Sequence, residues 1–167
     1  MPLNVQMRPG FRVTQSRALD LIGPSGTIGF ATGIELLDGT AASKADLMFS
    51  DQRSIAASGS ENLDLAGSLQ DAFGQTITFV KVKGIYLRAA AANGGNIVLG
   101  GAASNAFTGP FGAANDLIKV PAGGYIELCA PVAGWPVTAG TGDILQVAND
   151  DGAAAGIYDI VIVGTSA

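Results

Sequence analysis

The chain has 167 residues, of which 24 are glycine, one is cysteine and none is histidine. Histidine and cysteine supply most of the proton shuttles, nucleophiles and metal ligands that work near neutral pH, so the composition argues against an enzyme and predicts no cofactor. Only 14% of the residues are charged, against about 25% in soluble proteins. This sparse charge favours a structural or assembly protein whose surface is partly covered by a partner.

The first 17 residues differ in charge from the rest of the chain. They contain Arg8, Arg12 and Arg17 and no acid, whereas residues 18–167 contain six bases and all 14 acids, a net charge of −8. A basic leader on an acidic body is typical of an arm that docks on an oppositely charged neighbour, and a frayed, solvated terminus is the alternative. The acidic body argues against nucleic acid as a partner.

The sequence also bears on the place of synthesis and on disulfide bonds. Residues 1–6 lack the apolar stretch of a signal peptide, and no run of about 18 apolar residues occurs. We therefore expect synthesis inside the cell and no membrane partner. With Cys129 as the single thiol, an intramolecular disulfide is impossible, and its apolar neighbours favour a role as a small apolar filler.

Short apolar runs separated by turn-forming residues indicate β-strands in the first half of the chain. The run 28–37 ends at the turn signal Asp38-Gly39. Segments 45–49 and 53–56 are predicted as two short strands on either side of a turn at Asp51. The segment 61–65 alternates with period two and is predicted as a further strand.

The second half gives clearer strand signals. Segment 76–89 is the longest candidate, and its change of phase predicts burial on both faces or a bulge near Gly84. Lys81 and Lys83 stand two apart, a spacing that suggests protection of an exposed sheet edge. Segments 117–120 and 125–129 are predicted to pair as a hairpin about the turn at residues 121–124. Further strands are predicted at 97–99, 143–147 and 157–163.

Seven or eight strands with turns every 8 to 15 residues predict an all-β fold, a jelly-roll-like β-sandwich. We place this sandwich at residues 58–167. Residues 1–57 are predicted to form an extended N-terminal arm and extra strands, and one continuous domain is the alternative interpretation.

Four candidate sites deserve comparison with simpler explanations. Glycine-rich segment 23–29 resembles a phosphate loop but has no lysine and precedes a strand, so a turn is favoured. Residues 149–151, with Asp143 nearby, offer oxygen ligands for calcium, although turns favour the same residue types. Pairs of acids such as Asp64 and Asp71 are explained by turns and solvated strand faces. Trp135, between Gly134 and Pro136, is the first candidate for contact with a partner or ligand.

From Asp46 to Val163, about two-thirds of the chain resembles small structural proteins of tailed-bacteriophage virions. The resemblance rests on strand and turn patterns at residues 62–69, 73–74, 77–86, 121–124, 135–140 and 158–164. It implies a jelly-roll protein on the particle, a decoration or cement protein over the capsid shell. It carries over no functional residues.

The first hypothesis is therefore a capsid decoration protein on the virion surface, made in the host cytoplasm. Its partners would be the phage major capsid protein and one or two further copies of the chain, with the contacts made through the arm. Arg8, Arg12, Arg17 and Trp135 are the candidate partner-binding residues. The alternative hypothesis is a carbohydrate- or receptor-binding module of a phage tail or fibre, in which Trp135 would contact the ligand.

Overall fold

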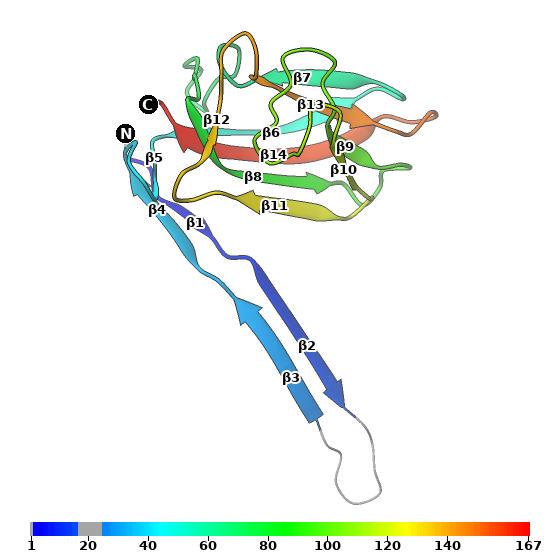
Figure 1. Cartoon of the computed structure of the whole chain (residues 1–167). Coiled ribbons are helices and arrows are strands. Elements are labelled where there is room, and N and C mark those ends of the chain that lie inside the picture. Colours follow the sequence, from blue (N-terminus) through cyan, green and yellow to red (C-terminus); the bar gives the residue numbers. More distant parts are fainter. Residues whose placement is uncertain (1, 17–24) are drawn as a thin grey trace, which may run out of the picture.

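The computed structural model describes residues 2–16 and 25–167. This part of the chain consists of strands and turns without a helix, so the predicted all-β class is confirmed. Two antiparallel sheets form a sandwich, and a β ribbon projects from one end of it (Figure 1). The jelly-roll order of the strands stays a prediction.

The sandwich consists of a larger and a smaller sheet. The larger sheet contains, in spatial order, β11 (Tyr125–Cys129), β8 (Lys81–Ala89), β14 (Gly156–Thr165) and β6 (Leu47–Ile55), and the short β12 (Trp135–Pro136) also pairs with β8. The smaller sheet contains β10 (Leu117–Val120), β9 (Ile97–Gly100), β13 (Ile144–Asn149) and β7 (Ser60–Asp64). Since β6 pairs with β14 along nine residue pairs, the segment 47–55 is part of the sandwich.

The core lies between the two sheets because apolar side chains alternate along the strands. Leu87 and Ile160 from the larger sheet meet Leu99 and Leu145 from the smaller one, and all four are at most 1% exposed. Burying such a side chain fully stabilises the fold by about 1.5–3 kcal/mol. The two sheets and the main core between them are therefore built by residues within 47–167.

The N-terminal ribbon is anchored on the outer face of the larger sheet. Its foot is formed by β1 (Val5–Met7), β4 (Ile34–Asp38) and β5 (Lys44–Ala45). Met7 and Leu36 pack with Val163 of β14 in a second, smaller apolar cluster.

Cys129 joins this cluster with its Sγ 3.6 Å from the Met7 Sδ, which confirms its role as an apolar filler. Burial raises the pKa of the Cys129 thiol.

Beyond the foot, β2 (Gly10–Ser16) and β3 (Ser25–Ala31) pair as an antiparallel hairpin that points away from the sandwich (Figure 1). The extended arm predicted for the N-terminal region is thus a two-stranded hairpin. The connection between its two strands lies outside the described residues, and so do residues 23 and 24 of the glycine-rich segment. Residues 25–29 of that segment lie in β3, so the turn predicted there is wrong for these residues.

Strand β8 contains the bulge predicted near Gly84. Val163 pairs with Gly84 but Gly164 pairs with Val82, so Lys83 is the extra residue. Lys83 is 1% exposed, and its Nζ donates a hydrogen bond to the carbonyl oxygen of Val132 at 2.6 Å. Desolvation lowers the pKa of this ammonium group. The predicted role of Lys81 and Lys83 at an exposed edge is wrong, because β8 lies inside the sheet.

Two other local predictions are wrong. Asp51 does not form a turn: it pairs with Ile160 in the middle of β6, which runs unbroken from Leu47 to Ile55. Strands β10 and β11 do not form a hairpin, because β10 pairs with β9 in the smaller sheet and β11 with β8 in the larger one. The turn at residues 121–124 therefore carries the chain from one layer to the other.

Candidate interaction surface

One face of the β2–β3 hairpin carries its four large apolar side chains. In the register of the pair, Phe11 lies opposite Phe30, and Val13 lies opposite Ile28. Residues directly opposite each other in an antiparallel pair point to the same face, and alternate positions share that face. The four side chains therefore form one continuous group, which we call the apolar stripe.

The apolar stripe is open to solvent. Phe11 is 66% exposed, Phe30 70% and Ile28 64%, and every residue of both strands is exposed. An isolated two-stranded hairpin is marginally stable in water, and grouped exposed apolar residues mark interaction sites. The hairpin is therefore a candidate interaction surface.

The opposite face of the hairpin is small and polar. Thr14 and Thr27 pair there, with their Oγ1 atoms 3.1 Å apart. The other cross-strand pairs on this face are Gly10 with Ala31, Arg12 with Gly29, and Ser16 with Ser25. Because Arg12 is the single charged residue among the 14 residues of the two strands, the hairpin has one apolar face and one polar, weakly basic face.

The predicted arginine sites lie along the ribbon. Arg8 is exposed at the end of the foot, where its Nη2 donates a hydrogen bond to the Oε1 of Gln6 at 2.7 Å. Arg12 is exposed in β2, and Arg17 lies outside the described residues. With the foot included, the described residues 2–16 and 25–45 carry Arg8, Arg12 and Lys44 against Glu35 and Asp38, a net charge of +1. Residues 46–167 carry five bases and 11 acids, a net charge of −6.

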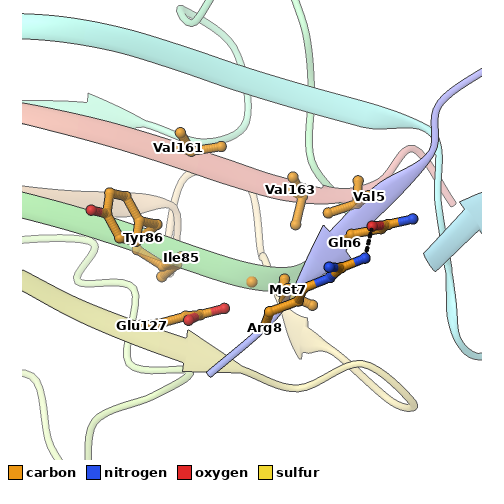
Figure 2. Close-up of a pocket in the computed structure, with 10 residues that line it drawn as sticks. Val5, Gln6, Met7, Arg8, Ile85, Tyr86, Glu127, Val161 and Val163 are labelled. Carbon is orange, nitrogen blue, oxygen red and sulfur yellow. Dashed lines mark hydrogen bonds between the residues drawn. The ribbon is translucent and has the colours of Figure 1, made fainter. Parts of the chain in front are cut away.

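A groove of about 280 Å³ lies where β1 crosses the outer face of the larger sheet (Figure 2). Its walls are mostly apolar, and Glu127 and Arg8 stand at its rim side by side with Gln6. The lining residues are Val5, Gln6, Met7, Arg8, Gly84, Ile85, Tyr86, Glu127, Val161 and Val163. Glu127 also lines a second hollow, of about 350 Å³, together with Phe11, Phe30 and Tyr125 at the base of the hairpin.

Trp135 does not belong to the hairpin surface. It is half-buried in β12, pairs with Val82 and packs against the main core. A Cβ atom on Gly109 would come within 2.3 Å of the Trp135 Cβ, so the chain passes this side chain closely. The structure therefore places Trp135 apart from Arg8 and Arg12, in a packing environment.

The acidic segment at residues 149–151 forms turn contacts. The buried Asn149 donates hydrogen bonds through its Nδ2 to carbonyl oxygens of Ala56 and Ala154. Asp150 accepts hydrogen bonds from the side chain and backbone of Asn96 and from Lys119, which lower its pKa. Among residues 2–16 and 25–167, no three His, Cys, Asp or Glu side chains come together as metal ligands.

The other paired acids of the sequence also cap turns. Asp64 accepts a hydrogen bond from the backbone N–H of Ala66, and Asp71 accepts hydrogen bonds from those of Phe73 and Gln75. These contacts match the interpretation that turn geometry explains the acids.

An exposed aromatic residue stands on the outer face of the larger sheet. Tyr125 is 62% exposed, and its ring centroid lies 5.9 Å from that of Tyr86. Beside it, Asp159 accepts hydrogen bonds from Gln52 and from Arg88, and these contacts lower its pKa. Tyr158, by contrast, is fully buried and donates its hydroxyl hydrogen bond to Glu61 at 3.0 Å.

The apolar stripe was missed by the sequence analysis, although the period-two pattern was present. Phe11 and Val13 alternate with Arg12 and Thr14, and Ile28 alternates with Phe30 across Gly29. This alternation predicts a strand with one apolar face. What it does not show is that this face stays mostly exposed among the described residues.

Comparisons with protein-family models, with curated proteins and with solved structures find no match to this chain. The part of the chain that the structure describes has no helix long and apolar enough to cross a membrane.

Proposed function

We propose that this chain is a structural protein of a bacteriophage virion, a decoration or cement protein that binds the assembled capsid shell. Its partner on the particle would be the major capsid protein, and its place of action the capsid surface. The bacteriophage setting comes from the sequence resemblance. The observation that carries the proposal is the projecting hairpin with its uncovered apolar stripe.

The dimensions of the hairpin suit a link between neighbouring subunits. Each strand has seven residues, which at about 3.4 Å per residue gives a reach of about 24 Å beyond the foot. A protein that binds only the assembled shell stabilises that shell by mass action. Repetition over a symmetric shell strengthens such contacts further, because neighbouring sites raise the effective concentration.

The charge of the ribbon supports the same role. The ribbon with its foot is weakly positive, because Arg8, Arg12 and Lys44 outnumber Glu35 and Asp38, while the sandwich is acidic. A positive ribbon is attracted to an acidic surface, and salt weakens this attraction at exposed positions. We therefore expect particle binding to weaken as the salt concentration rises.

The proposal is tested with capsids assembled without this chain. The purified protein is added to saturation, and the melting temperature of the particle is measured. We expect the particle to melt at a higher temperature with the intact protein and at an unchanged temperature with a hairpin-deleted variant. An unchanged melting temperature with the intact protein would defeat the proposal.

The structure offers a clean design for the hairpin-deleted variant. The Thr32 N–H donates a hydrogen bond to the Pro9 carbonyl oxygen at 3.2 Å, so the two strands are adjacent at this point. Residues 10–31 can therefore be replaced by an Asn-Gly turn that joins Pro9 to Thr32. The matched control is Phe73→Ser, which removes a 69% exposed phenylalanine from the sandwich and should leave particle binding unchanged.

A second candidate function is favoured by Tyr125. An exposed tyrosine beside the hydrogen-bonding groups of Arg88 and Asp159 has the chemistry to stack on a sugar face. If the chain is a carbohydrate- or receptor-binding module of a tail or fibre, Tyr125→Ala should abolish binding on a glycan array. Trp135→Ala is a poorer test, because its half-buried side chain packs against the core.

A further inference from the structure

We propose that this chain binds a quaternary ammonium group, such as the cationic end of choline, in the hollow between the base of the hairpin and β11. The inference goes beyond the proposed function and does not depend on it. It assigns a class of ligand to the place where aromatic rings from two parts of the chain meet one carboxylate.

Two pairs of side chains build this hollow, which has a volume of about 350 Å³. Phe11 and Phe30 are direct cross-strand partners at the base of the hairpin. Tyr125 and Glu127 stand two residues apart on β11, so both point to the same face of the larger sheet. The complete lining is Pro9, Gly10, Phe11, Phe30, Thr32, Tyr125 and Glu127. Three aromatic rings and one carboxylate therefore surround a single open space, which we call the aromatic hollow.

Contacts within the chain position both walls of the aromatic hollow. On the hairpin side, the Thr32 N–H donates a hydrogen bond to the Pro9 carbonyl oxygen at 3.2 Å, one residue pair before Gly10 and Ala31 begin the hairpin ladder. On the sheet side, the Tyr86 ring lies beside the Tyr125 ring, with their centroids 5.9 Å apart. A site that is formed before the ligand arrives loses less free energy in ordering its side chains.

Aromatic faces and a carboxylate are the groups that recognise an organic cation. The π electrons of a ring attract a cation within about 6 Å of the ring centroid, and groups of rings bind quaternary ammonium ligands in this way. Glu127 supplies the opposite charge. Among residues 2–16 and 25–167, no lysine or arginine nitrogen lies within 4.0 Å of its carboxylate. A cation therefore enters without displacing an ion pair.

The positive charges near the lining residues are engaged by other groups. Arg8 lines the neighbouring groove with Glu127, and its Nη2 donates a hydrogen bond to Gln6 (Figure 2). Arg88 pairs with Tyr125 across the sheet and forms an ion pair with Asp159, in which Nη2 and Oδ2 are 2.6 Å apart. Residues 46–167 carry a net charge of −6, so the field of the sandwich attracts cations to this face.

The aromatic hollow has few polar groups, and this favours a quaternary ammonium group over a primary amine or a sugar. Its polar side-chain groups are the Glu127 carboxylate and the hydroxyl groups of Thr32 and Tyr125. A primary ammonium group carries three N–H donors that need acceptors when water is removed, and a sugar carries several hydroxyl groups. A quaternary ammonium group donates no hydrogen bond. Since a cavity of about 150 Å³ holds benzene, the hollow has room for a trimethylammonium group.

The experiment titrates the intact protein with choline chloride and follows the backbone amide resonances by NMR, with sodium chloride as the reference salt. We expect saturable shifts at Phe11, Phe30, Tyr125 and Glu127, with a dissociation constant on the order of 1 mM for so small a ligand. The matched ligand is the carbon analogue of choline, in which a tert-butyl group replaces the trimethylammonium group. It has the same shape without the charge and should bind at least about threefold more weakly.

Two results of this titration would overturn the proposal. Equal binding of choline and its carbon analogue would show that the hollow takes apolar groups of any charge. Choline shifts that are no larger than those of sodium chloride would show that it takes no cation. Tighter binding of ethanolamine or of glucose than of choline would assign the hollow to a primary amine or to a sugar instead.

Variants of the lining residues test the roles of charge and ring separately. Glu127→Gln keeps the shape of the side chain and should lose the preference for choline over its carbon analogue. Phe30→Ala and Tyr125→Ala should each weaken choline binding at least about threefold, whereas Tyr125→Phe keeps the ring and should bind as the intact chain does. Phe73→Ser is the matched control, because Phe73 is 69% exposed on the sandwich and lies outside the hollow.

The variants also have an outcome that contradicts the proposal. If Phe73→Ser weakens choline binding as much as Phe30→Ala does, the ligand contacts exposed rings without a defined site. Far-UV circular dichroism shows that each variant is folded, and Tyr125→Phe and Glu127→Gln change the lining without removing a side chain. The test therefore stays decisive if an alanine variant fails to fold.

Phosphocholine distinguishes two sources of the same cationic group. Weaker binding of phosphocholine than of choline identifies the free cation as the ligand, because the phosphate would then meet the Glu127 carboxylate. Equal or tighter binding identifies choline esterified to phosphate. Both results support a quaternary ammonium site, and failure of both ligands to bind overturns it.

The outcome is separable from that of the proposed function. A chain that raises the melting temperature of capsids and does not bind choline refutes the aromatic hollow as a cation site and leaves the decoration role standing. A chain that binds choline and leaves capsids unaffected refutes the decoration role and leaves the cation site standing.

Discussion

Phenylalanine is buried in the core of the sandwich but exposed on the hairpin. Phe79 is 1% exposed in the main core, whereas Phe30 is 70% exposed on the hairpin. The inward-facing apolar side chains of the sandwich are covered by the opposite sheet. On the hairpin, Phe11 and Phe30 line only an open hollow with Tyr125 and Glu127, and the apolar stripe stays exposed. The comparison teaches that the core of this fold is closed without the hairpin, whereas the hairpin leaves its apolar stripe in contact with water.

The largest expected effect contrasts these two phenylalanines. Phe79→Ala should lower the free energy of unfolding by about 3–5 kcal/mol, because it leaves a cavity in a fully packed core. Phe30→Ala should change it by less than about 0.5 kcal/mol for the isolated chain at low concentration. Urea unfolding at a concentration where the chain is monomeric measures both. Similar losses for the two variants would mean that the stripe is covered within the single chain.

Two glycines sharpen the contrast at the backbone. A Cβ atom at Gly164 would come within 2.1 Å of the Lys81 carbonyl oxygen and 2.7 Å of the Phe79 ring, whereas one at Gly29 in the hairpin would meet nothing within 4 Å. Gly164→Ala should therefore destabilise by up to about 3 kcal/mol. Gly29→Ala should be neutral or slightly stabilising. Thermal melts of the two variants provide the check, and equal melting temperatures would contradict it.

A smaller effect is expected for two tyrosine hydroxyl groups. Tyr158→Phe removes the hydrogen bond to Glu61 inside the sandwich and should reduce the free energy of unfolding by about 1–2 kcal/mol. Tyr125→Phe changes a 62% exposed side chain and should have no measurable effect. Chemical denaturation distinguishes the two. A loss for Tyr125→Phe alone would show that its hydroxyl group has a partner in solution.

The smallest effect concerns pH. The pKa of Asp159 is lowered by hydrogen bonds from Gln52 and Arg88, and that of Asp150 by hydrogen bonds from Asn96 and Lys119. A lowered folded-state pKa gives stability that is present above the unfolded value of about 3.9 and is lost as the pH falls through the folded value. The melting temperature should therefore fall below about pH 4. The double variant D150N/D159N should show a shallower fall, and an identical profile would refute the assignment.

The strands were predictable from the sequence to a large extent, because alternation depends on local side-chain chemistry. The segments 117–120, 125–129 and 157–163 are strands as predicted. Their partners were not predictable from the same pattern. A tight turn between two strands suggests a hairpin, yet β10 and β11 join different layers, since that choice depends on packing against residues far along the chain.

The candidate surface shows the same division. The sequence placed Arg8 and Arg12 on an arm with a charge opposite to that of the body, and the structure puts both on the projecting ribbon. It did not reveal the apolar stripe, because alternation in 10–16 and 25–31 looks the same whether the apolar face is covered or bare. The prediction of a turn at Asp51 was wrong for a related reason. An acid fits a turn and an exposed strand position equally well, and β6 continues through Asp51 without reversing.

The bulge at Lys83 encloses this lysine, so its chemical reactivity can be used as a probe of local opening in the larger sheet. Lys44 and Lys119 are exposed and accessible to an amine-acetylating reagent, whereas Lys83 is enclosed with its Nζ bound to the Val132 carbonyl oxygen. Its amine becomes reactive only when the loop that carries Val132 lifts away or the sheet opens. The rate at which the Lys83 peptide gains the acetyl mass would therefore report how often this part of the folded molecule opens.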